Sequence, residues 1–162
     1  MRMDKLWAPW RMEYILSEKS EGCIFCDKPA ENKDRDNLIL WRGEYSFVIM
    51  NFYPYNNGHV MIVPYRHIND LNLIEDPESL ELFNGMATST HILKKLFKPE
   101  GFNIGMNLGR IAGAGIDDHL HFHIVPRWSG DTNFMPIVGH TKVVSEGLWE
   151  TYDQLYPYFN QH

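Results

Sequence analysis

The sequence predicts an α+β fold, and three features support that prediction. Short apolar runs bounded by turn residues fill much of the first half of the chain, a long segment with helical spacing follows, and further strand-like runs come after it. This order differs from the regular strand–helix alternation that builds a parallel sheet. Because short links join the early runs, they favour antiparallel pairing. We therefore expect an antiparallel sheet of about five strands, one main helix and a C-terminal helix.

The composition is that of an ordinary globular domain. The chain has 162 residues, of which 44% are hydrophobic and 22% charged, and its net charge is −6. An acidic balance argues against a general binder of nucleic-acid polymers, which needs clustered Lys and Arg. No apolar run reaches the roughly 18 residues of a membrane span, and the N-terminus lacks the apolar run of a secretory signal. We expect a single domain over residues 1–162, in the cytoplasm, with no membrane partner.

Three strand-like runs come before the main helix. Residues 37–41 and 45–50 are separated by a hairpin-like break at residues 42–44. The third run, residues 59–63, follows a turn-rich segment and is ended by a proline, which cannot donate to a sheet ladder. Ahead of all three, residues 27–37 carry seven charges, so we expect a solvated loop there.

The main helix is expected to begin at residues 76–78, where an acidic N-cap candidate precedes a proline and a second acid. Three lysines near its end suit the negative pole of the helix dipole, and Pro99 closes it. Beyond it, residues 102–107 and 119–125 are the fourth and fifth strand candidates, and residues 143–156 are the C-terminal helix candidate. The predicted buried face of the main helix consists of apolar residues near helical spacing: Leu80, Phe83, Ala87, Leu93 and Phe97.

Candidate chemistry is concentrated in the last strand candidate. His119, His121 and His123 alternate there with apolar residues. Because alternate side chains of a strand share a face, the three imidazoles are expected to line one face while the apolar residues point into a core. Such a row is unusual for a plain solvated face. It favours either metal coordination or nucleophilic and acid–base catalysis, and the spacing alone leaves both open.

A glycine-rich segment, residues 103–115, leads directly into these histidines. Its glycines let backbone N–H groups approach an anion closely, and Asn107 and Arg110 could add donors. By itself such a segment is most simply a turn. Next to three aligned histidines, it indicates a phosphate cradle beside a nucleophile.

The only two cysteines, Cys23 and Cys26, form a C-x-x-C pair. In a reducing compartment this pair is a metal half-site, a redox pair or two ordinary thiols. A redox role is disfavoured because no strand–helix–strand pattern surrounds the pair.

The string HLHFHIV at residues 119–125 resembles the signature of the histidine triad (HIT) superfamily of nucleotide hydrolases and transferases. The likeness extends to LWAPWRMEYI, NFYPYNNGHVMIVPYRH, GFNIGMNLG and HIVPRWSGDTNFMPIVG, which are similar to the bacterial diadenosine tetraphosphate phosphorylase and hydrolase-like branch. This resemblance, from Leu6 to about Val144, implies a HIT-like fold with its core at residues 23–144. It also implies cleavage of a dinucleoside polyphosphate at the α-phosphorus, by water or by inorganic phosphate as a co-substrate.

The resemblance also implies roles for individual residues. His121 matches the nucleophile that forms a nucleotidyl-histidine intermediate, and His123 and His59 match the histidines that line and orient the site. Asn51 matches the position that holds the ribose hydroxyls, and Asn107 one that contacts phosphate. The implied substrate-binding set is Asn51, Asn107, Gly113, Gly115 and Asp118.

As in zinc-bearing members of the family, Cys23 and Cys26 could complete a tetrahedral site with His67 and His119. Four protein ligands would make this a closed, structural Zn²⁺ site, one per chain. His119 would then serve the metal while His121 serves the chemistry.

Several alternatives remain open. Many family hydrolases carry a glutamine four residues before the first triad histidine, where this chain has Gly115, and a small residue there resembles the phosphorylase-type members. Hydrolysis of nucleoside phosphoramidates and a non-enzymatic nucleotide-binding sensor or interaction module are the alternative functions. The resemblance further suggests a homodimer with residues 1–20 at its interface, and residues 128–134 are expected to close over the substrate.

Overall fold

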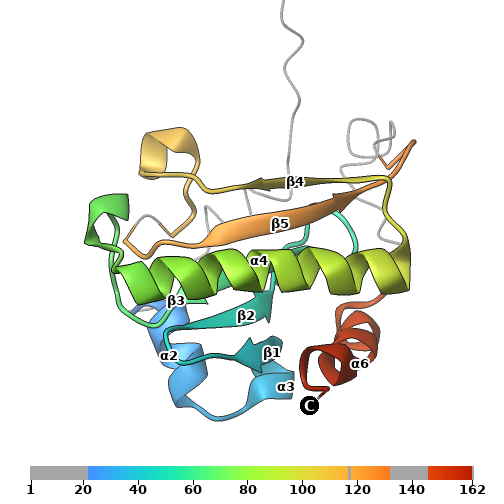
Figure 1. Cartoon of the computed structure of the whole chain (residues 1–162), viewed down its shortest axis with the longest axis horizontal. Helices are drawn as coiled ribbons and strands as arrows, with labels where there is room; N and C mark the ends of the chain where they lie inside the picture. Colours follow the sequence, from blue (N-terminus) through green and yellow to red (C-terminus); the bar gives the residue numbers. More distant parts are fainter. Residues whose placement is uncertain (1–21, 117, 132–145, 162) are drawn as a thin grey trace, which may run out of the picture.

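The computed structural model in Figure 1 describes residues 22–116, 118–131 and 146–161. Its centre is a five-stranded antiparallel sheet in the order β1-β2-β3-β5-β4. This arrangement confirms the predicted α+β class and the predicted pairing. The strands are β1 (Ile39–Arg42), β2 (Ser46–Met50), β3 (Val60–Pro64), β4 (Gly101–Gly105) and β5 (Phe122–Arg127).

Two longer helices cover one face of the sheet. α4 (Asp76–Phe97) lies across that face, and α6 (Leu148–Phe159) packs beside it against β1 (Figure 1). Their buried side chains share a core with the sheet residues that point toward them, among them Val48, Ile62 and Ile124. No helix in the described residues is long and apolar enough to span a membrane.

The opposite face is covered by the N-terminal part of the described chain. Phe25 of α2 (Ile24–Ala30) packs with Ile49 and Met61 in a second apolar cluster. Because both faces of the sheet are covered, β2 and β3 are buried at every position. This explains why those strands read as continuous apolar runs in the sequence.

The expectation of a solvated loop over residues 27–37 was wrong. Most of that segment forms α2 and α3 (Asp34–Asn37), separated by a short turn. Its charged residues are largely exposed, but Pro29 and Asn37 are buried. The seven charges therefore reflected the exposed surface of these two helices and gave no information on the residues that they bury.

The predicted buried face of α4 also needs correction. Leu80 and Phe83 are 64% and 67% exposed, whereas the buried positions are Glu78, Leu82, Gly85, Ser89, Ile92 and Leu93. Small residues occupy the middle of that stripe because the helix lies close to β3 there. A methyl group added at Gly85 would collide with the Ile62 side chain. Leu93 is buried as predicted and Phe97 packs against the core, whereas Leu80, Phe83 and Ala87 are exposed. Helical spacing of the large apolar residues alone therefore selected the wrong positions in the first half of the helix.

The predicted starts of both longer helices shift. The N-cap of α4 is Glu75 and not Asp76, while the proline falls in the first turn as expected. The C-terminal helix begins at Leu148, after the N-cap Gly147, and its predicted start at residues 143–145 lies outside the described residues. The predicted interface segment, residues 1–20, and the last three residues (132–134) of the tract expected to close over the substrate also lie outside them. Two short 3-10 helices, η1 (Leu71–Leu73) and η2 (Arg110–Ala112), complete the described fold.

Candidate active site and metal-binding cluster

Strand pairing places His123 on the sheet face opposite α4. In the antiparallel register His123 of β5 lies opposite Met61 of β3, and Met61 lies opposite Ile49 of β2. Directly opposed residues share a face, so the His123 imidazole joins the Ile49 and Met61 side. The neighbouring Ile124 is in the core under α4. The predicted division between a histidine face and a core face therefore holds for this strand.

The predicted continuous strand from residue 119 was wrong, because β5 begins only at Phe122. The preceding residues hydrogen-bond to a loop: the Leu120 N–H donates to the Ile68 carbonyl over 2.7 Å. His119 and His121 thus lie in the segment that leads into the strand. The rings of His121 and His123 are nevertheless adjacent, with centroids 4.9 Å apart.

The His121 ring is held in the tautomer that carries its proton on Nδ1. Its Nδ1 lies 2.9 Å from the backbone carbonyl of His119, and a carbonyl only accepts, so the proton resides on Nδ1. The side chain is 6% exposed, and the Phe25 ring packs on it with centroids 4.9 Å apart. Burial lowers the pKa of His121, although the hydrogen bond to the carbonyl opposes this shift. The result is a neutral imidazole whose Nε2 carries a lone pair.

A second chain of hydrogen bonds fixes His59 and His123. The Tyr55 N–H donates to His59 Nδ1 over 3.1 Å, so the proton of a neutral His59 is on Nε2. That nitrogen lies 2.9 Å from His123 Nδ1 and donates to it. A neutral His123 therefore carries its own proton on Nε2 and acts as a donor there.

A cavity of about 400 Å³, here called cavity 1, opens beside His121 and His123. It combines apolar walls from α2 and β2 with polar groups from several parts of the chain, a combination typical of a small-molecule site. One of these polar groups is Lys28, whose ammonium lies 4.4 Å from the centre of the Phe52 ring and whose pKa is lowered by burial. The lining residues are Ile24, Phe25, Lys28, Asp36, Asn37, Ile49, Met50, Asn51, Phe52, Tyr53, Tyr55, Met61, Asn107, Gly113, Gly115, Ile116, His121 and His123.

Most of the residues expected to bind substrate line cavity 1. Asn51, Asn107, Gly113 and Gly115 are all among its walls, although they come from separate parts of the chain. Asp118 is exposed and lies outside this lining. His59 is buried behind His123 and contacts the site through it.

The glycine-rich segment folds back on itself beside the cavity. Gly109 and Gly113 have φ angles of +78° and +92°, which glycine adopts without the strain other residues would suffer. The Ala112 and Ala114 N–H groups both donate to the Gly109 carbonyl, so these two amides stabilise the turn. The side chain of Asn107 reaches the Gly113 carbonyl at 3.4 Å.

Three residues that shape the site have no predicted role. Phe25 packs on both His119 and His121, Lys28 is a cation within cavity 1, and the Tyr55 amide sets the proton position of His59. Phe25 and Tyr55 lie inside motifs that were noted for other reasons. Nothing in the sequence indicated a role for Lys28, because residues 27–37 were expected to form a solvated loop.

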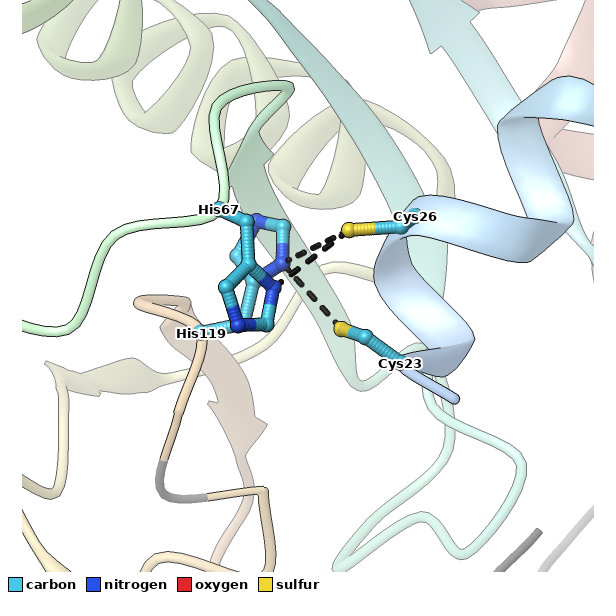
Figure 2. A group of neighbouring side chains, drawn as sticks. All are labelled: Cys23, Cys26, His67 and His119. Atoms are coloured by element: carbon cyan, nitrogen blue, oxygen red, sulfur yellow. Dashed lines mark hydrogen bonds between the residues drawn. The ribbon is translucent and has the colours of Figure 1, made fainter. Parts of the chain in front are cut away.

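A second cluster, shown in Figure 2, brings together Cys23, Cys26, His67 and His119. The cysteines come from the start of α2, His67 from the loop after β3, and His119 from the lead-in to β5. One ligand atom from each residue lies within 4.8 Å of the others. His119 Nδ1 is 3.2 Å from Cys23 Sγ and 3.6 Å from Cys26 Sγ, and His67 Nδ1 is 3.4 Å from Cys26 Sγ. Sulfur and nitrogen ligands of one tetrahedral zinc lie about 3.5 Å apart, so the spacing fits.

The protonation states suit a cation in this cluster. His119 Nε2 donates to the Pro64 carbonyl over 2.8 Å, which leaves the Nδ1 lone pair directed at the sulfurs. Burial lowers the pKa of His119 and favours its neutral, ligating form. Burial, followed by the neighbouring Cys23, raises the pKa of the Cys26 thiol to about 11, so a cation is needed to stabilise its thiolate. These four side chains could hold a metal ion.

Comparison with known proteins agrees with this geometry. The family model described as HIT domain matches residues 32–130. AP-4-A phosphorylase of Mycobacterium tuberculosis is 38% identical over 159 residues, which cover 93% of this chain and 81% of that protein. Bis(5'-adenosyl)-triphosphatase of Saccharomyces cerevisiae is 31% identical over 94 residues, covering 56% of this chain and 44% of the yeast protein.

Solved structures share the fold. A Zn-bound histidine triad family protein from Mycobacterium smegmatis superposes with a TM-score of 0.69 at 20% identity, covering 87% of this chain and 95% of the other. A member of the HIT family from Bacillus subtilis gives a TM-score of 0.60 at 25% identity, covering 68% and 76%. On the family match and the mycobacterial relative, the chain belongs to the HIT family.

Proposed function

We propose that this protein cleaves dinucleoside polyphosphates, with diadenosine tetraphosphate as the leading substrate, at the α-phosphorus. The observation that carries the proposal is the buried, neutral His121, whose only proton is donated to the His119 carbonyl and whose Nε2 lone pair is therefore available beside cavity 1. The substrate class is supported by the relatives, an AP-4-A phosphorylase and a bis(5'-adenosyl)-triphosphatase.

In the first step His121 Nε2 attacks the α-phosphorus and forms a phosphorus–nitrogen bond. The bond to the bridging oxygen breaks, and its electron pair leaves with the remaining nucleotide. The imidazolium that forms still donates Nδ1–H to the His119 carbonyl, which stabilises its charge. The Nε2–H of His123 is the donor placed to stabilise the departing oxygen, and His59 holds His123 in that form.

In the second step water or inorganic phosphate attacks the same phosphorus, and the electron pair of the phosphorus–nitrogen bond returns to His121. Water would give AMP and ATP from diadenosine tetraphosphate, and phosphate would give ADP and ATP. We propose phosphorolysis. The small Gly115 in the wall of cavity 1 leaves room for an incoming phosphate, and the mycobacterial relative is named a phosphorylase.

The walls of cavity 1 suit one nucleotide of this substrate. Phe25, Ile49 and Phe52 offer apolar surface for a base, and Asn51 offers an amide for the ribose hydroxyls. Asn107 and the Gly115 backbone are the proposed contacts of the α-phosphate. The Gly113 N–H donates to the Arg110 carbonyl over 3.0 Å, so Gly113 lines the cavity without supplying a donor. Asp118 remains a predicted contact that the cavity lining does not support.

We also propose that Cys23, Cys26, His67 and His119 bind one structural Zn²⁺. Four protein ligands leave no open coordination position, so the ion would hold α2 to the lead-in of β5 without touching substrate. The Zn-bound histidine triad protein from Mycobacterium smegmatis supports the choice of metal. By holding His119, the ion would also fix the position of His121, because the His119 carbonyl orients the His121 ring.

A homodimer is the assembly we propose. Within the described residues β4 pairs only with β5, so its other edge is available, and Ile104 on β4 is 49% exposed. An edge strand of this kind can pair with the same strand of a second copy.

The test of the proposed function is product analysis with diadenosine tetraphosphate, with and without inorganic phosphate. ADP together with ATP, formed only when phosphate is present, would establish phosphorolysis, whereas AMP with ATP in both cases would establish hydrolysis. Cleavage of a nucleoside phosphoramidate but not of the dinucleotide would support the alternative enzyme. Nucleotide binding without any turnover would support the sensor.

His121→Ala is expected to lower the rate of cleavage by at least about 10³-fold, because the nucleophile is removed, while nucleotide binding persists. The matched control is His91→Ala, which removes an exposed histidine on α4. Single-turnover rates and calorimetric binding would separate chemistry from affinity. Turnover at the wild-type rate in His121→Ala would exclude His121 as the nucleophile.

A further inference from the structure

A second cavity lies next to cavity 1 on the same face of the sheet. This cavity 2 has a volume of about 400 Å³ and shares Tyr55, Asn107 and His123 with cavity 1. In the register of β4 and β5, Gly105 lies opposite His123 and Asn103 opposite Val125, so these residues face the same side as His123. His123 therefore separates one cavity, over β2 and β3, from another over β4 and β5.

The charged groups of cavity 2 neutralise one another. Arg127 Nε and Nη2 donate to the Asp131 carboxylate over 2.6 and 3.0 Å, and Nη1 donates to Asn103 Oδ1 over 2.7 Å. The same carboxylate accepts from the Asn56 amide over 2.6 Å and from the Trp128 N–H over 3.1 Å. Because Arg127 is paired, this cavity does not present the unpaired cation that an inorganic phosphate site needs.

The remaining surface of cavity 2 mixes aromatic, apolar and amide groups. Tyr55, Met106 and Val125 offer flat or apolar contact. Asn103, whose Oδ1 accepts from Arg127, offers its amide NH2 as a donor. A nucleoside needs such a mixture, since a base stacks on apolar surface while its edges and the ribose hydroxyls form hydrogen bonds. An uncharged moiety also suits a site without net charge.

We propose that cavity 2 binds the second nucleoside of the dinucleoside polyphosphate, the one that departs with the leaving nucleotide. The inference rests on the proposed function and extends it to the other half of the substrate. His121 lines cavity 1, and His123 lines both cavities. A polyphosphate chain that is cleaved at His121 and crosses the Nε2–H donor of His123 leads into cavity 2. Recognition of both nucleosides would then explain a preference for dinucleotides over mononucleotides.

Gly105 provides a test that leaves the fold intact. It faces cavity 2, and a Cβ added there meets no atom within 4 Å. Gly105→Leu would fill the cavity with side chain. The matched control is Gly101→Leu on the same strand, where an added Cβ also meets nothing within 4 Å but which lies outside the lining of cavity 2.

The readout is kcat/KM for diadenosine tetraphosphate and for adenosine 5'-tetraphosphate, which differ only in the second nucleoside. We expect wild type to favour the dinucleotide, and Gly105→Leu to lower kcat/KM for it about tenfold or more while changing the mononucleotide value less than about twofold. Gly101→Leu should change neither value.

Three results would overturn the inference: equal kcat/KM for the two substrates in wild type, no effect of Gly105→Leu on either, or an equal loss on both. An equal loss would place the effect on His123 and not on a nucleoside site. If wild type cleaves neither substrate, the proposed function fails and this inference fails with it. If wild type cleaves both equally, only the inference fails.

Discussion

At the scale of single residues, proton positions matter as much as residue identity. The three histidines of the motif differ because each has a different backbone or side-chain partner. His119 donates Nε2–H to the Pro64 carbonyl and keeps Nδ1 for the cysteines, whereas His121 donates Nδ1–H and keeps Nε2 for the cavity. Neither partner can be identified from the motif itself.

A buried hydroxyl in α4 provides a stability prediction at this scale. Ser89 Oγ is buried and has no hydrogen-bond partner among the described residues. Ser89→Ala removes the cost of that unpaired group, so we expect the free energy of unfolding to rise by about 1 kcal/mol. Urea denaturation at pH 7 measures it.

Thr151→Ala is the matched comparison, since the Thr151 hydroxyl is buried but lies 3.0 Å from both Asn57 Oδ1 and Glu146 Oε2. Losing those contacts should lower the free energy of unfolding by about 1 kcal/mol. A loss of stability in Ser89→Ala equal to that in Thr151→Ala would show that Ser89 has a partner after all.

At the scale of elements, the start of α4 anchors the loop that carries His67. Arg66 donates to both oxygens of Glu78 over 2.7 Å, and Glu78 also accepts the Glu75 N–H over 2.9 Å. The Glu78 side chain is 3% exposed. The hydrogen bond with Arg66 is the main reason that the pKa of the Glu78 carboxyl is lowered. An interaction that caps a helix thereby also positions the loop that brings His67 to the cluster with Cys23, Cys26 and His119.

Glu78→Gln is expected to lower the free energy of unfolding by about 2 kcal/mol at pH 7, because a nearly buried charged hydrogen bond is lost. The pKa of Glu78 in the folded protein lies below that of the unfolded chain, which is about 4.3. The extra stability of wild type over the variant is therefore fully present at pH values above the unfolded pKa. It should disappear as the pH falls through the folded pKa. Denaturation of wild type and variant across pH 7 to 2.5 measures this.

The exposed pair of Arg35 and Asp153 serves as the comparison, because it has similar bidentate geometry but both side chains are more than half exposed. Asp153→Asn should have a much smaller effect, since solvent screens that pair. If the difference between wild type and Glu78→Gln stayed constant down to pH 2.5, the charge of Glu78 would not be the cause.

At the scale of the whole molecule, the proposed zinc ion would join three separate parts of the chain. The cysteines begin α2, His67 follows β3, and His119 leads into β5 (Figure 2). Because the site is assembled only in the folded state, metal binding adds to the free energy of unfolding. The same ion would fix the segment that carries the proposed nucleophile.

We expect purified protein to contain one zinc per chain. Removing it with a chelator, or replacing a ligand in Cys23→Ser, should lower the free energy of unfolding by at least about 2 kcal/mol and reduce turnover. Elemental analysis and thermal denaturation are the measurements. Added Zn²⁺ should restore chelated wild type but not Cys23→Ser, and metal-free protein with full stability would contradict the proposed site.

Several features of this protein follow from the sequence alone. Periodicity and turn residues predicted the five-stranded antiparallel sheet, because strand pairing here is mostly between neighbours in the chain. The HIT motif identified the family, because its histidines and their spacing are themselves the chemical requirement. The charged segment of α2 and α3 and the first half of the buried stripe of α4 were mispredicted, since burial there depends on Phe25, Pro29 and Gly85 fitting against distant strands.

Only the tertiary structure decided which atoms meet. Sequence spacing cannot show that His121 Nδ1 points at the His119 carbonyl, that His59 backs His123, or that a second cavity lies beyond His123. These relations join residues of different strands and loops, and they depend on register, ring orientation and packing. Local sequence preferences specify the type of most elements, whereas the direction of a lone pair is set by the neighbours that the complete fold supplies.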